Sequence, residues 1–185
     1  LSDIVKKYIK NKYKKPGDVF LGTIHRIDRP TSGIVLFART SKALSRMNKK
    51  FRDKEVQKTY WAIVENRPPN KSDTLENFIK KDEKRNKSYV TKSAEGKYAK
   101  LEYKILNKLD NVFHLEIKPE TGRHHQIRVQ LANIGCIIKG DLKYGGKRSN
   151  KDGSIHLLAQ RIEFIHPVNK KLITTIAKPK EDSIW

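Results

Sequence analysis

The sequence predicts an α+β fold: a mixed, mainly antiparallel β-sheet with flanking helices, within a single domain over residues 1–185. Predicted strands outnumber predicted helices, and most strands follow one another through hairpins, which favours antiparallel pairing. The 185 residues include 36% hydrophobic ones, enough for one core. No internal repeat or linker divides the chain.

The first third of the chain is predicted to form helix, strand and helix. Residues 1–15 carry apolar side chains at helical spacing among lysines, and Pro16 follows them as a breaker. Residues 33–39, GIVLFAR, form a nearly continuous apolar run that predicts a buried strand. Ser41 fits the N-cap of a helix that continues to Phe51.

The rest of the chain is predicted to consist mostly of strands. The charged segment 72–97 predicts an exposed hairpin or loop, whose charges either face solvent or grip phosphates. A helix over 124–134 stops at Gly135. The other predicted elements are strands: 58–65, a hairpin over 98–118 that turns at KLDN, and a last pair at about 155–165 and 171–177.

Positive charge dominates the composition. The chain has 41 Lys and Arg against 20 Asp and Glu, a formal charge of +21. Such a charge exceeds what solubility requires and concentrates polyanions near the protein. We expect a nucleic acid as partner rather than a membrane, because the basic residues are spread along the chain and not gathered on one amphipathic helix.

The single cysteine limits the chemistry further. Cys136 has no second cysteine for a disulfide, and no CxxC pair is present for a thiolate zinc site. This pattern fits the reducing cytoplasm, where we expect the protein to act. No apolar stretch is long enough to span a bilayer.

The segment after Thr121-Gly122 predicts an anion site. The predicted helix opens with Arg123, His124 and His125, so basic side chains and backbone N–H groups would converge on a phosphate. We expect no metal there. Neighbouring helical residues do not face one another, and no third ligand has a useful spacing.

Four sequence blocks follow, in order, the motifs of one enzyme family. HRIDRPTSG, from residue 25, is similar to the pattern HR-L-D-x-x-TSG. TGRHHQIRVQLANIGCIIKGDLKYG, from residue 121, is similar to (S/T)GR-x-HQIRVHLA-x-x-G-x-P-I-x-GD-x-x-YG. Between them KTYWAIV resembles K-x-Y-x-A-x-V, and near the end of the chain LLAQRIEFIHP resembles LHA-x-x-L-x-F-x-HP. Four blocks in this order are far more specific than any one of them, and together they resemble the pseudouridine synthases of the RluA/RluD type.

The resemblance implies the pseudouridine synthase catalytic fold and the isomerisation of uridine within RNA, without a cofactor. The N1–C1′ bond breaks, the uracil turns, and C5 joins C1′. Asp28 matches the catalytic aspartate of the family, which acts as a nucleophile or as a base. A carboxylate suits either role. Without the motif, a surface ion pair between Asp28 and Arg29 would be the ordinary interpretation.

Two further residues match the catalytic positions of the family. Arg128 corresponds to the arginine that pairs with the aspartate, and a neighbouring cation keeps a carboxylate ionised and oriented. Its alternative is a phosphate-binding or surface arginine. Tyr60 matches the active-site tyrosine, whose ring can stack on uracil and whose hydroxyl can help to move the C5 proton. Its alternative is an ordinary core residue.

Other residues are predicted to contact the substrate. Ile138 stands where the family has an apolar residue over the base, although a core role also fits. Arg26 either occupies the space left by a flipped nucleotide or contacts a phosphate. His25 is expected to fix the loop by hydrogen bonds. The remaining predicted substrate contacts are Arg29, Arg123, His125 and Gln126.

The sequence departs from the family patterns at several positions. Gln130 and Leu158 replace histidines, His124 replaces a Ser or Thr, and Cys136-Ile137 replaces a common His-Pro pair. None of these is a predicted catalytic residue, so the departures bear on the choice of RNA. The K-P-x-G strand of the family is missing from the first twenty residues. We therefore expect either that the sequence starts inside the domain or that the fold is trimmed here, so that this strand and any N-terminal RNA-binding domain are lacking from it.

Ribosomal RNA is the expected substrate, with transfer RNA as the alternative, and the protein is expected to be a monomer. The main rival function is a non-catalytic basic RNA-binding module, which would not need Asp28. A nuclease is the weakest candidate, because its metal ions need clustered acids and the acids here are scattered.

Overall fold

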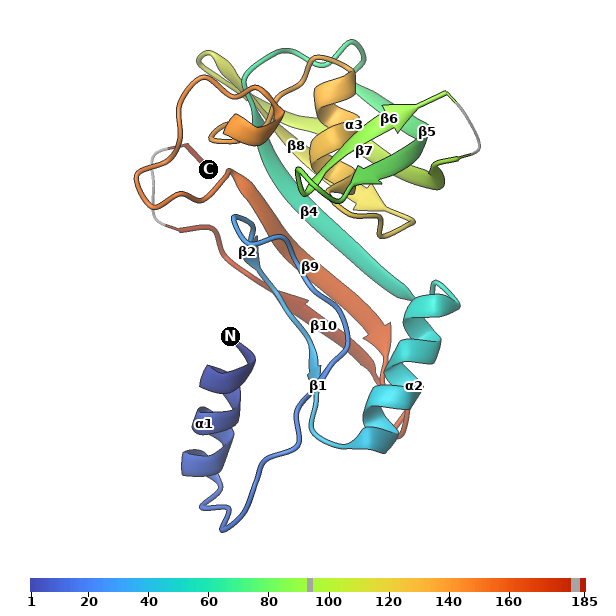
Figure 1. The fold of residues 1–185 in the computed structure, drawn as a ribbon, viewed down its shortest axis with the longest axis vertical. Helices are drawn as coiled ribbons and strands as arrows, with labels where there is room; N and C mark the ends of the chain where they lie inside the picture. The colour runs from blue at the N-terminus through green and yellow to red at the C-terminus, as the bar shows by residue number, and fades with distance from the viewer. Residues whose placement is uncertain (93–94, 181–183) are drawn as a thin grey trace. The chain divides into compact units, whose positions relative to one another are not determined.

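A computed structural model of the chain describes residues 1–92, 95–180 and 184–185 (Figure 1). Its contacts divide the chain into two compact units. The smaller unit comprises Leu1–Ile27, Val35–Gln57 and Glu163–Thr174, and the larger one comprises Asp28–Ile34, Lys58–Ile162 and Thr175–Trp185. The described residues form α-helices and mainly antiparallel strands, which confirms the predicted α+β class. That both units act as one catalytic domain stays a prediction.

The smaller unit contains both predicted N-terminal helices. They are α1 (Ser2–Lys12) and α2 (Ser41–Arg52), and the short strands β1 (Gly22–Thr23) and β3 (Phe37–Ala38) pair antiparallel between them in sequence. The N-cap of α2 is Thr40, one residue before the predicted Ser41, and its hydroxyl accepts from the N–H of Ala43. His25 fixes the loop as expected, since its Nε2 accepts from the N–H of Leu36 at 3.0 Å.

The prediction of a buried strand over residues 33–39 is wrong. This run contains only the end of β2 (Ser32–Gly33) and the two residues of β3, and Ala38 alone is buried. The reason is a long-range contact at Gly33, whose φ is +112° and where a Cβ would lie 2.3 Å from the carbonyl oxygen of Ala159. β2 pairs parallel with β9 (Leu157–Ile165) at this point. Only glycine permits this close approach.

The larger unit is built on a sheet whose strands follow the order β9-β4-β8-β7-β5-β6, and β10 (Leu172–Ile176) continues the order beyond β9. The predicted strand 58–65 and the predicted hairpin over 98–118 are both present. The charged segment forms a hairpin of β5 and β6; residues 93 and 94 of that prediction lie outside the described residues. The bounds are β4 (Val56–Val64), β5 (Ser72–Asp82), β6 (Lys87–Thr91), β7 (Lys97–Leu109) and β8 (Val112–Pro119).

Helix α3 (Gln126–Asn133) packs on one face of this sheet (Figure 1). Ile127 and Leu131 from the helix meet Leu101, Leu115 and Ile117 from the strands in one hydrophobic core. Full burial of such a side chain stabilises the fold by roughly 1.5–3 kcal/mol. Every residue from 126 to 131 is buried, so α3 presents its polar side chains inside the protein. Within the described residues, no helix is long and apolar enough to cross a membrane.

Candidate active site

Asp28 is held by a short turn of the larger unit. The N–H of Thr31 donates to the carbonyl oxygen of Asp28 at 2.9 Å, and the N–H of Ile155 donates to that of Pro30 at 2.9 Å. The parallel pairing of β2 with β9 follows directly. The backbone on the C-terminal side of Asp28 is thus anchored to the sheet, while its side chain keeps 27% exposure.

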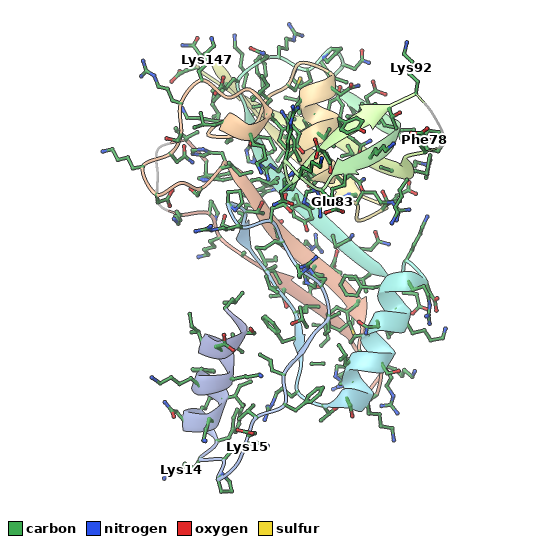
Figure 2. All side chains as sticks on the ribbon, viewed as in Figure 1. Lys14, Lys15, Phe78, Glu83, Lys92 and Lys147 are labelled. Atoms are coloured by element: carbon green, nitrogen blue, oxygen red, sulfur yellow. The ribbon has the colours of Figure 1, made fainter. Side chains whose placement is uncertain are left out.

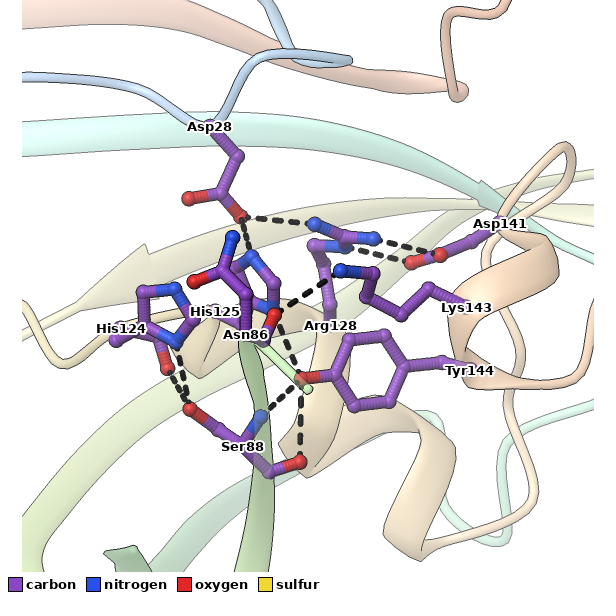
Figure 3. Close-up of polar contacts among 9 residues, drawn as sticks. All are labelled: Asp28, Asn86, Ser88, His124, His125, Arg128, Asp141, Lys143 and Tyr144. Carbon is purple, nitrogen blue, oxygen red and sulfur yellow. Dashed lines mark hydrogen bonds and ion pairs between the residues drawn. The ribbon is translucent and has the colours of Figure 1, made fainter. Parts of the chain in front are cut away.

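A buried arginine joins Asp28 to a second aspartate (Figure 3). Arg128 Nη1 lies 3.3 Å from Oδ2 of Asp28, and its Nε and Nη2 each lie 2.7 Å from an oxygen of Asp141. The side chains of Arg128 and Asp141 are only 4% and 1% exposed. Burial lowers the pKa of Arg128, but the bonds to Asp141 and the negative charges outweigh this, and the net pKa is raised. The guanidinium therefore stays charged and fixed in orientation.

Asp141 owes its position to a tight turn. The carbonyl oxygen of Asp141 accepts from the N–H groups of Tyr144 and Gly146, around a 3₁₀ turn over Leu142–Tyr144. A Cβ on Gly146 would lie 2.9 Å from the backbone of Asp141, so glycine is needed for this close approach. The turn holds the side chains of Asp141 and Tyr144 close to Arg128, whose guanidinium carbon lies 5.1 Å from the centre of the Tyr144 ring.

A second chain of contacts reaches Asp28 through His125. Its Nε2 lies 4.0 Å from Oδ2 of Asp28, and its Nδ1 lies 2.9 Å from the hydroxyl of Tyr144 (Figure 3). That hydroxyl also contacts the backbone N–H and carbonyl oxygen of Ser88. The ring of His124 stacks on that of His125 with 3.8 Å between centres, and its Nδ1 meets the hydroxyl of Ser88. Asp28 is thus connected, through His125, to a network of hydrogen-bonded polar groups.

His125 is a neutral ring in this setting. Burial and, after it, the positive charge of Arg128 lower its pKa from 6.5 to about 3. The unfolded chain therefore binds more protons than the folded protein between these two values. We predict that the free energy of unfolding falls as the pH is lowered from 6.5, and that the His125→Gln variant shows a shallower fall. Urea unfolding at pH 7, 6 and 5 measures both slopes, and equal slopes would contradict the assignment.

Tyr60 lies on β4 and packs, partly buried, against the hydrophobic core. Burial, and next the charge of Asp28, raise the pKa of its phenol to about 12, so the hydroxyl keeps its proton. Lys58 precedes it by two residues and therefore lies on the same face of the strand. Burial lowers the pKa of the Lys58 ammonium group. The three predicted catalytic residues thus belong to one unit, and two of them contact each other directly.

The other predicted contacts differ in exposure. Gln126 is buried and binds the protein itself: its Oε1 accepts from Thr121 and from the N–H of Arg123, and its Nε2 donates to Lys100. The N–H of Arg123 is therefore not free for a phosphate, and α3 begins at residue 126 rather than 124. Ile138 is 1% exposed and lies in the core. The side chains of Arg26, Arg29 and Arg123 are exposed, and Arg26 belongs to the smaller unit.

Sequence reasoning assigned no role to Asp141 or Tyr144. Both lie in the block from residue 121, within KGDLKYGG, where one acid stands between lysines and glycines follow closely. The available signal was the motif itself, because GD-x-x-YG of the family pattern covers both positions. The partners of these side chains are more than ten residues away, and neither helical nor strand periodicity links such positions.

The chain was compared with known proteins. A family model described as RNA pseudouridylate synthase matches residues 2–133. Ribosomal large subunit pseudouridine synthase D of Zymomonas mobilis is 31% identical over 169 residues, covering 87% of this chain and 53% of that protein. Ribosomal large subunit pseudouridine synthase C of Vibrio cholerae is 34% identical over 163 residues, covering 85% and 51%. The chain thus spans about half the length of these relatives.

A solved structure agrees at the level of the fold. Human RNA Pseudouridylate Synthase Domain Containing 4 superposes with a TM-score of 0.78 and 22% sequence identity, covering 96% of this chain and 78% of that one.

Proposed function

Because the chain belongs to the RNA pseudouridylate synthase family, we propose that it isomerises uridine to pseudouridine within RNA. The proposal rests on the carboxylate of Asp28, which has one oxygen in contact with protein groups and one without a partner. Its Oδ2 faces Arg128 and His125, whereas its Oδ1 has no hydrogen-bond or ion-pair partner among the described residues. One oxygen fixes the orientation and the other is free to react.

In the proposed reaction, Asp28 acts on the ribose of a uridine that has left the base stack. It attacks C1′ as a nucleophile and forms an ester while the C1′–N1 bond breaks, or it removes a ribose proton as a base so that the same bond breaks by elimination. The uracil then turns and C5 bonds to C1′. At this point the carboxylate leaves C1′, or the ribose takes its proton back, and the uracil exchanges its C5 proton for one on N1. Tyr60 supplies a ring to stack on the uracil and a protonated hydroxyl near Asp28. Arg29 and Arg123, both exposed, are proposed to bind phosphates.

Within this proposal His125 positions Asp28 rather than binding substrate, because its side chain is 8% exposed. The hydroxyl of Tyr144 has one proton, and both the carbonyl oxygen of Ser88 and Nδ1 of His125 lie within hydrogen-bond distance of it. Nε2 of His125 faces Oδ2 of Asp28 at 4.0 Å, and a lone pair on Nε2 would be unfavourable against the carboxylate. We therefore propose the Nε2–H tautomer, in which the Tyr144 proton goes to Nδ1 rather than to Ser88.

The Tyr144→Phe variant tests this positioning. It removes the partner of His125 Nδ1 and of the Ser88 N–H, while the ring that contacts Arg128 stays. We expect kcat to fall, by up to about 10²-fold, with KM for RNA unchanged, since the loss is one of orientation. Steady-state kinetics on one RNA separates the two constants. A change in KM alone would contradict a positioning role.

Ribosomal RNA is the proposed substrate, supported by the names of the two bacterial relatives, which are ribosomal large subunit pseudouridine synthases. We also propose that the protein acts as a monomer in the cytoplasm. A free, buried Cys136 suits a reducing compartment.

Release of tritium tests the function itself. RNA transcribed with C5-tritiated uridine loses its label to water when C5 joins C1′. We expect time-dependent release with the protein and ribosomal RNA. Tight binding with no release from any cellular RNA would instead favour the non-catalytic binding module.

A further inference from the structure

The smaller unit carries far more positive charge than its size requires. Its residues include 16 Lys and Arg against 5 Asp and Glu, although it contains none of the Asp28 site. Lys14 and Lys15, in the loop after α1, point into solvent (Figure 2). A field of this strength on a unit without the catalytic residues requires its own explanation.

Three lysines on the sheet of the larger unit are paired with acids. Lys80 lies 2.6 Å from Glu95, Lys100 lies 3.0 Å from Glu120, and Lys118 lies 3.6 Å from Glu116. Acids of the same unit therefore weaken the attraction of these three cations for a polyanion. Other lysines of the sheet, such as the exposed Lys104 and Lys108 of β7, have no ion-pair partner among the described residues.

Helix α2 has a different arrangement. Leu44 and Met47 pack inward, so Lys42 and Arg46, four residues apart, share an exposed face. Neither of them has an ion-pair partner among the described residues. The nearby acids Asp53 and Glu55 follow the C-terminal end of the helix, where they pair with Lys49 and Lys50.

The position of Lys42 is electrostatically unfavourable for the helix. The N-terminal end of a helix carries partial positive charge and prefers acidic side chains. The first turn of α2 has no acid and contains Lys42. The exposed Arg39, whose guanidinium carbon lies 4.2 Å from the centre of the Tyr13 ring, directly precedes the N-cap. Local choices that oppose stability, as Lys42 does here, are typical of functional sites.

We propose that Arg39, Lys42 and Arg46, the α2 basic surface, bind the phosphate backbone of the RNA substrate. The choice of RNA over an acidic protein rests on the proposed function. The contact would be electrostatic and independent of base sequence, and it would carry none of the chemistry. The smaller unit would thereby raise the affinity for long, structured RNA.

The test is the double variant Lys42→Gln/Arg46→Gln. The matched control is Lys104→Gln/Lys108→Gln, which removes the same charge from two exposed lysines of β7 in the larger unit. Binding of a fluorescently labelled RNA stem–loop with a uridine-rich loop is measured from 0.1 to 1 M salt. The slope of log affinity against log salt should fall by about 1.5 in the α2 variant, because two phosphate contacts are lost. Affinity at 0.1 M salt should fall roughly 30-fold by the same relation.

Further measurements keep the result interpretable. The thermal midpoint of the α2 variant should equal or exceed that of the wild type, because the charge of Lys42 leaves the positive end of the helix. Its rate of tritium release at saturating RNA should be unchanged.

Equal salt slopes in the α2 variant and the control would overturn the proposal, even with full activity. If the α2 variant binds RNA as tightly as the wild type does, but an acidic polypeptide no longer competes with RNA for it, the surface binds a protein. That result would also overturn the proposal. If the wild type releases no tritium but its salt slope still differs from that of the α2 variant, only the proposed function is refuted.

Discussion

The Asp28→Asn variant is expected to lose tritium release by at least about 10⁴-fold, the order seen when a nucleophile or its essential partner is removed. The amide keeps the shape of the side chain, and its oxygen can still accept from Arg128. It lacks the charge needed to attack C1′ or to take a proton. A single-turnover time course with excess protein measures the chemical step free of product release.

Two measurements accompany this variant. Its affinity for RNA should match that of the wild type, because one exposed carboxylate contributes nothing to phosphate binding. The Asp152→Asn variant serves as a matched control, since Asp152 is an exposed acid of the same unit, paired with Lys180. Full activity of Asp152→Asn beside the loss in Asp28→Asn is the expected pattern. Residual release within tenfold of the wild type would assign the reaction to another group.

Asp141→Ala is expected to have the largest effect on folding. It leaves the guanidinium of Arg128, 4% exposed, with Asp28 as its only carboxylate partner in the described part of the chain. Removing one member of a buried ion pair costs about 3–5 kcal/mol, a large part of the stability of an average domain. Urea unfolding at pH 7 measures the loss.

A second substitution separates charge from shape at this position. Replacing both partners, in Asp141→Leu/Arg128→Met, should recover part of the stability, because no unpaired charge is then buried. Activity should stay absent, since Arg128 no longer orients Asp28. If Asp141→Ala unfolds at the same urea concentration as the wild type, then the pair with Asp141 does not fix Arg128.

Much of the fold follows from patterns within short segments. Strand β4 and the β7–β8 hairpin were predicted because apolar alternation and a turn at KLDN are local signals. The broken run at 33–39 was not predicted, because its interruption depends on Ala159, far away in sequence. A continuous apolar run does not reveal that its first glycine must fit against another strand.

The candidate site shows the same limit. The motifs predicted that Arg128 pairs with Asp28, and the two side chains are in contact. They did not predict that Arg128 binds Asp141 through two shorter contacts, or that Gln126 closes the turn before α3. Those roles depend on which side chains meet across the core, and residue type alone leaves them open. The exposed Arg29 and Arg123 are the reverse case, since the motifs predict for them a contact with the substrate and not with the protein.

Identification of the product tests the central claim most directly. Ribosomal RNA is incubated with the wild type or with Asp28→Asn, digested to nucleosides and separated by chromatography. We expect pseudouridine in place of an equal amount of uridine with the wild type and none with the variant. Unchanged uridine with a wild type that binds the RNA, or equal pseudouridine from both proteins, would contradict it.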